Sequence, residues 1–90
     1  MLDAFYTTKF KKDIRLLKKR NYDLKKINAL IDILCRGELL PANYFDHQLN
    51  GNYAGYRECH IEPDWLLIYK IKNNTLTLVL SRTGSHSDLF

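Results

Sequence analysis

Apolar side chains near the N-terminus follow a short strand pattern and then a helical one. Residues 2–6 are mixed in polarity, which fits an edge strand. Thr7 or Thr8 then offers an N-cap for a helix over residues 9–20, because a hydroxyl there can accept a hydrogen bond from the first helical turn. Three apolar residues of this helix recur at helical spacing: Phe10, Ile14 and Leu17. Lysines occupy its other face.

A second helix is predicted directly after the first. Asn21 or Asp23 caps its start, it runs to about Arg36, and Gly37 supplies its C-terminal stop. One continuous apolar stripe follows this helix: Leu24, Ile27, Leu30, Ile31 and Leu34. The two helices therefore form a hairpin.

The C-terminal half alternates between strand and turn signals. Residues 39–55 are rich in Pro, Asn and Gly, which predicts a long loop that displays His47. Strands are predicted at 56–61, 65–72 and 76–82, separated by a Glu-Pro-Asp turn and an Asn-Asn turn. These strands form an antiparallel meander.

The order of elements predicts an α+β fold. An N-terminal strand, a helical hairpin and a three-stranded antiparallel meander would form one sheet that packs on the helices and leaves its other face open. The tail, residues 84–90, is too short and polar for a predicted helix. We expect residues 1–90 to form a single domain, because a chain of this size buries only about 60% of its unfolded surface.

Positive charge is concentrated in the helical segment. The chain has a formal net charge of +4, and residues 9–26 carry nine Lys and Arg against only Asp13 and Asp23. Such a run is often just a solvated helix face, but phosphate backbone or an acidic protein would also match it. Three of its lysines are candidate substrate-binding residues: Lys9, Lys11 and Lys12.

The two cysteines indicate a reduced environment. Cys35 and Cys59 lie in no CxxC or Cys-His ligand spacing, and the chain shows no signal peptide and no apolar run near about 18 residues. We expect a cytoplasmic protein that does not contact a membrane. Both thiols fit core positions better than nucleophile positions.

Three histidines supply the candidate chemistry. His47, His60 and His86 are the only ones in the chain, and each lies near an acid or an arginine. Imidazole titrates near neutrality, and neighbouring cations would hold a phosphate beside it. Strand periodicity puts Glu58 and His60 on one face of the sheet and Cys59 on the other, so Cys59 cannot pair with His60.

Three segments of the chain resemble the YafQ branch of the RelE/ParE toxin superfamily. They are residues 46–49 (DHQL), 55–65 (GYRECHIEPDW) and 82–90 (RTGSHSDLF). The likeness spans nearly the whole chain, although the helical region supports it only in general layout. It implies a RelE-like fold.

The resemblance also implies an activity and partners. Members are bacterial type II toxins: ribosome-dependent endoribonucleases that cut mRNA in the A site of the 70S ribosome and inhibit translation. Their activity is metal-independent and requires no cofactor. A cognate acidic antitoxin holds them inactive, and operator DNA is bound only through the antitoxin complex. We expect the antitoxin to wrap residues 9–26, and either to leave the histidine face open or to displace the tail.

The family's functional positions fall on five residues of this chain. They are His47, His60, Asp64, His86 and Phe90. Glu58 stands where close relatives place Asp, which keeps the carboxylate but moves it by one methylene.

RNA carries its own nucleophile, the 2′-hydroxyl, so an enzyme needs a base, an acid and positive charge on the developing phosphorane. We assign His86 as general acid or base, with His60 or Asp64 as its counterpart. Arg82 would stabilise the phosphate, His47 would position substrate or transfer a proton, and Phe90 would stack on a base.

Each assignment has a structural alternative. His47 could be a surface residue, His60 a half-buried strand residue paired with Glu58, Arg82 a partner of Asp88, and Phe90 a core residue.

Two other functional classes remain open. The histidines and Asp64 could form a zinc site, although their spacing gives no preorganised ligand pair. The chain could instead be a non-catalytic basic binding module, or a ParE-like toxin that acts on gyrase. Several acid–base groups on one face favour RNA cleavage over these.

Overall fold

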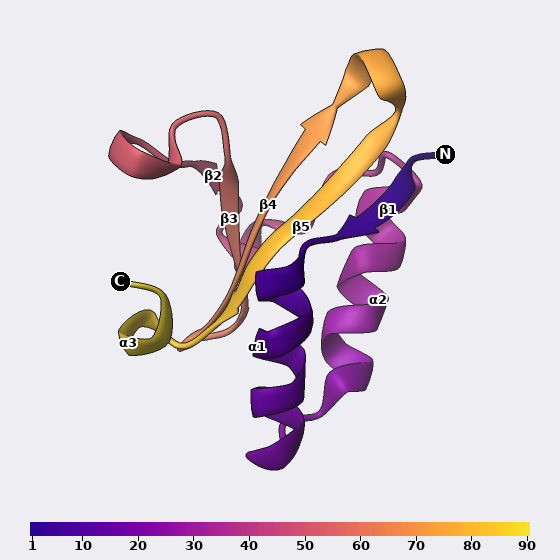
Figure 1. Ribbon diagram of the computed structural model, residues 1–90. Coiled ribbons are helices and arrows are strands. Elements are labelled where there is room, and N and C mark those ends of the chain that lie inside the picture. The colour runs from indigo at the N-terminus through magenta and orange to yellow at the C-terminus, as the bar shows by residue number, and fades with distance from the viewer.

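The computed structural model describes residues 1–90 as a five-stranded mixed sheet with two helices packed beside it (Figure 1). The strand order is β1-β5-β4-β3-β2. The elements are β1 (Asp3–Tyr6), α1 (Thr8–Lys19), α2 (Leu24–Cys35), β2 (His47–Gln48), β3 (Arg57–Glu62), β4 (Trp65–Lys72), β5 (Thr77–Gly84) and α3 (His86–Leu89). Three 3-10 turns join them: η1 (Ala42–Tyr44), η2 (Gly51–Tyr53) and η3 (Asn73–Thr75). Figure 1 shows α1 and α2 next to β1 and β5, with β2 and α3 at the opposite side of the sheet.

Each helix of the hairpin begins after an N-cap residue that the sequence predicted. The Thr7 hydroxyl accepts a hydrogen bond from the Phe10 N–H at 3.0 Å, and the Asp23 carboxylate accepts one from the Lys25 N–H at 3.1 Å. Both side chains satisfy donors that have no partner inside the helix. Asn21 has φ +63° and reverses the chain between the helices, so Asp23 is the cap.

The predicted edge strand and meander are confirmed. β1 lies at one edge and pairs in parallel with β5, while β3, β4 and β5 pair in antiparallel order. One bound was wrong: the last strand was predicted to begin at Leu76, but β5 begins at Thr77. Leu76 lies in the turn before it, with φ +50°, and is 58% exposed. The register of β4 and β5 also shifts between Ile68 and Tyr69, a bulge that period-two alternation does not reveal.

The predicted loop at 39–55 contains a fifth strand, so placing His47 on a loop was wrong. β2 pairs antiparallel with β3, with His47 opposite Glu58. Asp46 fixes this segment because one of its oxygens accepts from Arg57 Nε at 3.1 Å and from the Tyr69 hydroxyl at 2.8 Å. A strand of two residues is too short for alternation to reveal, and tertiary contacts hold it.

The tail forms the short helix α3, which the sequence did not predict. Ser85 and Asp88 make reciprocal side chain to backbone hydrogen bonds in a capping box, and Arg20 Nη1 donates to Asp88 Oδ2 at 2.8 Å. Leu89 is buried against the sheet. These long-range contacts stabilise a helix that is too short to form by itself.

The two faces of the sheet carry apolar clusters of different size. Twelve buried residues fill the space between the helices and the sheet, including Cys59 and Leu67. On the other face the apolar cluster has three buried residues, Leu66, Ile68 and Leu89, so that face is partly covered rather than wholly open. None of the helices could span a membrane.

Candidate active site

A buried carboxylate joins two histidines on the second face of the sheet. Glu58 is 5% exposed, and its Oε1 lies 3.5 Å from Nε2 of His47 and 3.5 Å from Nε2 of His60. The β2–β3 pairing places His47 opposite Glu58, while His60 follows Glu58 by two residues on the same face of β3. The predicted shared face of Glu58 and His60 is thus confirmed, and His47 joins it.

Both of these rings meet an oxygen acceptor at each nitrogen. Nδ1 of His47 lies 2.6 Å from the Phe45 carbonyl oxygen, and Nδ1 of His60 lies 3.3 Å from the Pro63 carbonyl oxygen. A neutral imidazole can donate from only one nitrogen, so only the protonated ring donates to both neighbours. Each ring lies between a backbone carbonyl oxygen and the Glu58 carboxylate, and these two contacts fix its orientation.

His86 has a different environment. Its backbone N–H donates to Asp64 Oδ1 at 3.0 Å, and its Nδ1 lies 3.3 Å from the same oxygen. These two interactions lower the pKa of Asp64, so the carboxylate is ionised at neutral pH and can accept a hydrogen bond from Nδ1–H of His86. Nε2 of His86 has no hydrogen-bond partner in the protein, and the side chain is 59% exposed.

The three rings form a row that ends at an exposed aromatic. The ring centroids of His47 and His60 are 6.4 Å apart, those of His60 and His86 are 6.2 Å apart, and those of His86 and Phe90 are 6.0 Å apart. Phe90 is 62% exposed and so is not the core residue of the alternative interpretation. Residues from β2, β3, the turn after β3 and α3 therefore converge on one surface.

Arg82 lies beside this surface but is already paired. Its Nε and Nη2 donate to the two oxygens of Asp13 at 2.7 and 3.0 Å, and Asp13 Oδ2 also accepts from the Thr83 N–H at 3.1 Å. The hydrogen bonds to Asp13 raise the pKa of Arg82, with a smaller contribution from Tyr53. The alternative that paired Arg82 with Asp88 is wrong, because Asp88 binds Arg20.

Sequence reasoning did not assign a role to Asp13, Tyr53 or Phe45. One signal was present for Asp13: it is one of only two acids among nine cations.

Comparison with known proteins places the chain in a family. Residues 2–90 match the model of the bacterial toxin of type II toxin–antitoxin systems, YafQ. The chain belongs to the YafQ toxin family. It is 44% identical over 89 residues to the mRNA interferase toxin YafQ of Escherichia coli K12, covering 98% of this chain and 95% of the relative.

Solved structures of YafQ-like toxins share the fold. A metal-bound toxin from Helicobacter pylori matches with a TM-score of 0.94 and 43% identity, covering all of both chains. YafQ in the E. coli DinJ–YafQ complex matches with a TM-score of 0.91 and 42% identity, covering 100% of this chain and 99% of that one. The RelE-like α+β class predicted from the sequence is therefore confirmed.

The basic surface of this YafQ-family toxin has few internal partners. Of the nine cations in residues 9–26, only Arg20 and Lys26 form ion pairs, with Asp88 and Glu62. The three candidate substrate-binding lysines on α1 are exposed: Lys9, Lys11 and Lys12. No hydrogen bond or ion pair connects them to the histidines. These lysines are therefore free to contact another molecule.

The geometry of this YafQ-family chain gives little support to a metal site or to a cysteine nucleophile. No three His, Cys, Asp or Glu side chains are arranged to hold a metal ion. Cys59 lies in the core on the opposite face from His60, where burial raises the pKa of its thiol. Cys35 is half-buried, and both cysteines are free. Acid–base chemistry at the histidines is what the arrangement can perform.

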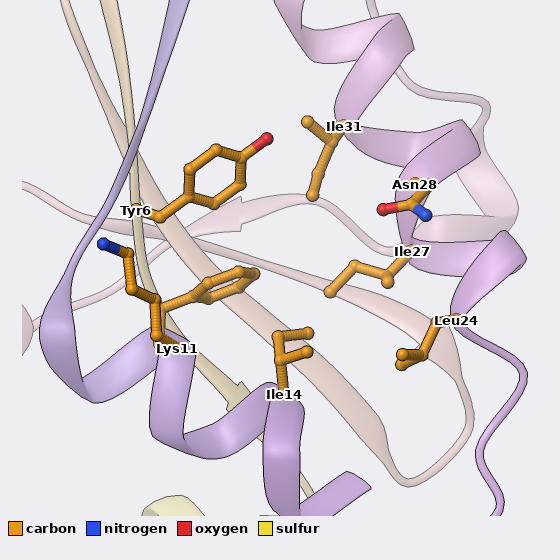
Figure 2. Close-up of a pocket in the computed structure, with 8 residues that line it drawn as sticks. Tyr6, Lys11, Ile14, Leu24, Ile27, Asn28 and Ile31 are labelled. Carbon is orange, nitrogen blue, oxygen red and sulfur yellow. The ribbon is translucent and has the colours of Figure 1, made fainter. Parts of the chain in front are cut away.

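An apolar pocket of about 440 Å³ lies away from the histidines, between the two long helices. Figure 2 shows Ile14 of α1 and Ile27 and Ile31 of α2 pointing into it, with Tyr6 at the end of β1 beside them. Lys11 borders the pocket, so the basic and apolar surfaces of the YafQ-family helical hairpin adjoin.

Proposed function

We propose that this YafQ-family toxin is an mRNA interferase, as its E. coli relative is named, and that residues 1–90 act as one toxin domain. In this proposal it is a ribosome-dependent, metal-independent endoribonuclease that cuts mRNA in the A site of the 70S ribosome and so inhibits translation. Ribosomes place the proposed activity in the bacterial cytoplasm. The observation that carries the proposal is the row of three histidines, two around the buried Glu58 and one oriented by Asp64.

The proposed reaction requires no cofactor. A base removes the proton of the 2′-hydroxyl, and the 2′-oxygen forms a bond to the adjacent phosphorus as the bond to the 5′-oxygen breaks. An acid gives its proton to the departing 5′-oxygen. The products are a 2′,3′-cyclic phosphate and a 5′-hydroxyl. Between these steps the phosphorane carries extra negative charge, which fixed cations stabilise.

The contacts of each histidine support a division of roles. His86 is the general acid or base, because its Nδ1 is held by Asp64 while Nε2 is free. His60 is its counterpart, and Asp64 acts by orienting His86. His47 and His60, both in contact with Glu58, would face the phosphate, and each ring would present positive charge to it when protonated. Phe90 offers its exposed ring to a base beside His86.

Arg82 contributes to the phosphate site in this proposal. Asp13 occupies Nε and Nη2, which fixes the plane of the guanidinium and leaves Nη1 directed away from the pair. The held cation then needs no reorganisation during the reaction. Lys9, Lys11 and Lys12 would contact the RNA backbone, because they are exposed on α1 and form no ion pair within the protein.

The partner that the surface supports is an acidic antitoxin. The E. coli relative is seen in a complex with DinJ. Seven of the nine cations in residues 9–26 have no ion-pair partner, and an apolar pocket adjoins them. A segment that carries acids and apolar side chains would satisfy both surfaces as it folds on binding. Operator DNA would be bound only through that complex.

Cleavage of a defined mRNA by the purified chain tests the proposal. The assay compares the native chain with His86→Ala and His60→Ala, with and without 70S ribosomes, and with toxin that has or has not been stripped with EDTA and freed of it before the ribosomes, which need Mg²⁺, are added. Leu39→Ala is the matched control, because Leu39 is 94% exposed and lies outside the site. We expect cuts within codons only with ribosomes, unchanged by EDTA, and about 10²- to 10⁴-fold slower in the histidine variants.

The EDTA arm is decisive because a related toxin from H. pylori is described as metal-bound. Loss of cleavage by EDTA-stripped toxin on intact 70S ribosomes, with recovery when a transition-metal ion is returned to the toxin, would overturn the metal-independent mechanism. Cleavage that survives in both histidine variants would overturn the assigned roles. A chain that binds an acidic partner but never cuts RNA would belong to the non-catalytic class.

A further inference from the structure

Phe45 combines an unfavourable backbone conformation with an exposed ring. It follows η1 with φ +51° and ψ +41°, a left-handed conformation that residues with a side chain rarely adopt. Its side chain is 65% exposed, so the ring contributes little to the core. Folding stability alone would favour Gly or Asn at this position.

Leu76 shows what the same turn looks like without a functional neighbour. It follows η3 with φ +50° and ψ +45° and is 58% exposed, at the hairpin between β4 and β5. No ring or titratable group is recorded against it. The two positions share a backbone geometry and differ only in what surrounds them, which makes Leu76 an internal control.

The surroundings of Phe45 are the candidate active site. Its ring meets the His60 ring edge-on, with centroids 5.7 Å apart, and its carbonyl oxygen lies 2.6 Å from Nδ1 of His47. Together with His47 and His60 it borders a cavity of about 640 Å³. The left-handed backbone thus directs the carbonyl oxygen to one histidine while the ring lies against the next.

Exposed aromatic rings therefore lie at two separate places along the histidine row, one against its central ring and one against its last ring. Phe45 is next to His60, and Phe90 is next to His86, with its centroid 6.0 Å away. A scissile phosphate always lies between two nucleotides. Unpaired RNA bases are held by stacking on aromatic side chains, and each base of the pair needs its own ring.

We propose that Phe45 is a second base-stacking residue, which holds the base on the side of the scissile phosphate opposite the one that Phe90 holds. The inference rests on the proposed ribonuclease function and names the ligand of the cavity beside His47 as an unpaired RNA base. The ring of Phe45 would fix the distance of that nucleotide from His60, whereas its carbonyl oxygen orients His47 in the absence of RNA.

Matched glycine variants separate the ring from the backbone. Glycine adopts the left-handed conformation without strain, so Phe45→Gly and Leu76→Gly should each melt at the same temperature as the native chain or higher. We expect Phe45→Gly to cut mRNA roughly 5- to 150-fold less efficiently, the range that loss of one stacked base gives. Leu76→Gly should cut like the native chain, and Phe45→Trp should retain activity. Equal cleavage by Phe45→Gly and Leu76→Gly would overturn the inference.

Substrates that lack one base make the test specific. Removing the base on one side of the scissile phosphate should abolish the difference between native and Phe45→Gly, and removing the other base should abolish the effect of Phe90→Ala. A Phe45→Gly defect that persists on both abasic substrates would show that the ring acts on the protein, not on a base.

A binding assay keeps this inference separate from the proposed function. The probe is a 70S ribosome whose A-site codon carries 2′-deoxyribose, which removes the nucleophile but not the bases. A native chain that binds this probe without ever cutting the ribose form would overturn the ribonuclease function alone. If the Phe45→Gly variant bound this ribosome probe as tightly as the native chain, the stacking role would be overturned. The same would hold if the substitution weakened only the binding of an antitoxin.

Discussion

The two faces of the sheet use alternate residues of the same strand for different purposes. On β3, Cys59 is completely buried against the helices, whereas its neighbours Glu58 and His60 face the other way and form part of the histidine cluster. On β4, Leu67 joins the twelve-residue core while Leu66 and Ile68 join a cluster of three. One face is built for packing, and the other carries the titratable groups.

The difference shows how the candidate site can tolerate a buried charge. Glu58 is the only buried acidic residue, and two histidines contact its carboxylate. No buried side-chain nitrogen or oxygen lacks a partner. An unpaired buried carboxylate would be costly, so the larger apolar core on the helix face must stabilise the fold that holds Glu58 in place. Substitutions on one face should therefore change folding, and those on the other should change rate.

Truncation of the helix-facing core should have the largest effect. Leu67 is completely buried, so Leu67→Ala should lower the free energy of unfolding by about 2–5 kcal/mol. The RNA cleavage rate per folded molecule should not change, because Leu67 does not touch the histidine face. Urea denaturation and cleavage at low temperature measure the two quantities, with Leu67→Met as the volume-conserving control. A reduced rate in fully folded Leu67→Ala would break the separation of the faces.

Removal of the buried charge on the other face should act in the opposite way. Glu58→Gln keeps the shape of the side chain but removes the negative charge between His47 and His60. A charged contact at 3.5 Å contributes no more than a charge-assisted hydrogen bond, about 1.5–3 kcal/mol, so cleavage should fall by up to roughly 10- to 150-fold while the urea midpoint changes little. Glu38→Gln, an exposed carboxylate paired with Arg36, is the control and should cut normally. Native-like cleavage by Glu58→Gln would remove Glu58 from the mechanism.

Sequence patterns predicted the packed face better than the histidine face. The helix caps at Thr7 and Asp23, the edge position of β1 and the bounds of β4 follow from local rules of capping and alternation. β2 and α3 do not. They are two and four residues long, and they form because Asp46 binds Tyr69 and Asp88 binds Arg20, contacts between residues far apart in the chain.

The same reasoning explains what was predicted of the site. Period two placed Glu58 beside His60, and the structure adds His47 through the β2 pairing. The Arg82–Asp13 pair joins residues 69 positions apart and leaves no local pattern. Which histidine is acid or base stays a prediction, because the resemblance supplied those roles and the contacts only favour one arrangement.

Release of the tail should have a smaller effect on both faces. Asp88→Asn removes the ionic partner of Arg20 and weakens the cap of α3, which should lower the free energy of unfolding by about 1 kcal/mol. Because α3 begins with His86 and is followed directly by Phe90, cleavage should also fall, by less than in His86→Ala. Hydrogen exchange at the Phe90 amide, which donates to the His86 carbonyl oxygen at 2.8 Å, reports the loosened tail. An unchanged exchange rate would show that Leu89 packing alone holds α3.

Acid should produce the smallest and most selective change, again in the tail. The hydrogen bond from Arg20 lowers the pKa of Asp88 from 3.8 to about 2. A depressed pKa contributes stability that is fully present above pH 4 and is lost as pH falls through 4 towards 2. After allowance for solvent screening, the loss from this group at pH 3 should be on the order of 1 kcal/mol or less. Urea midpoints of the native and Asp88→Asn chains isolate the contribution of Asp88. The difference between the two midpoints should shrink between pH 4 and pH 2. A constant difference would mean that packing, and not the ion pair, attaches the tail to the histidine face.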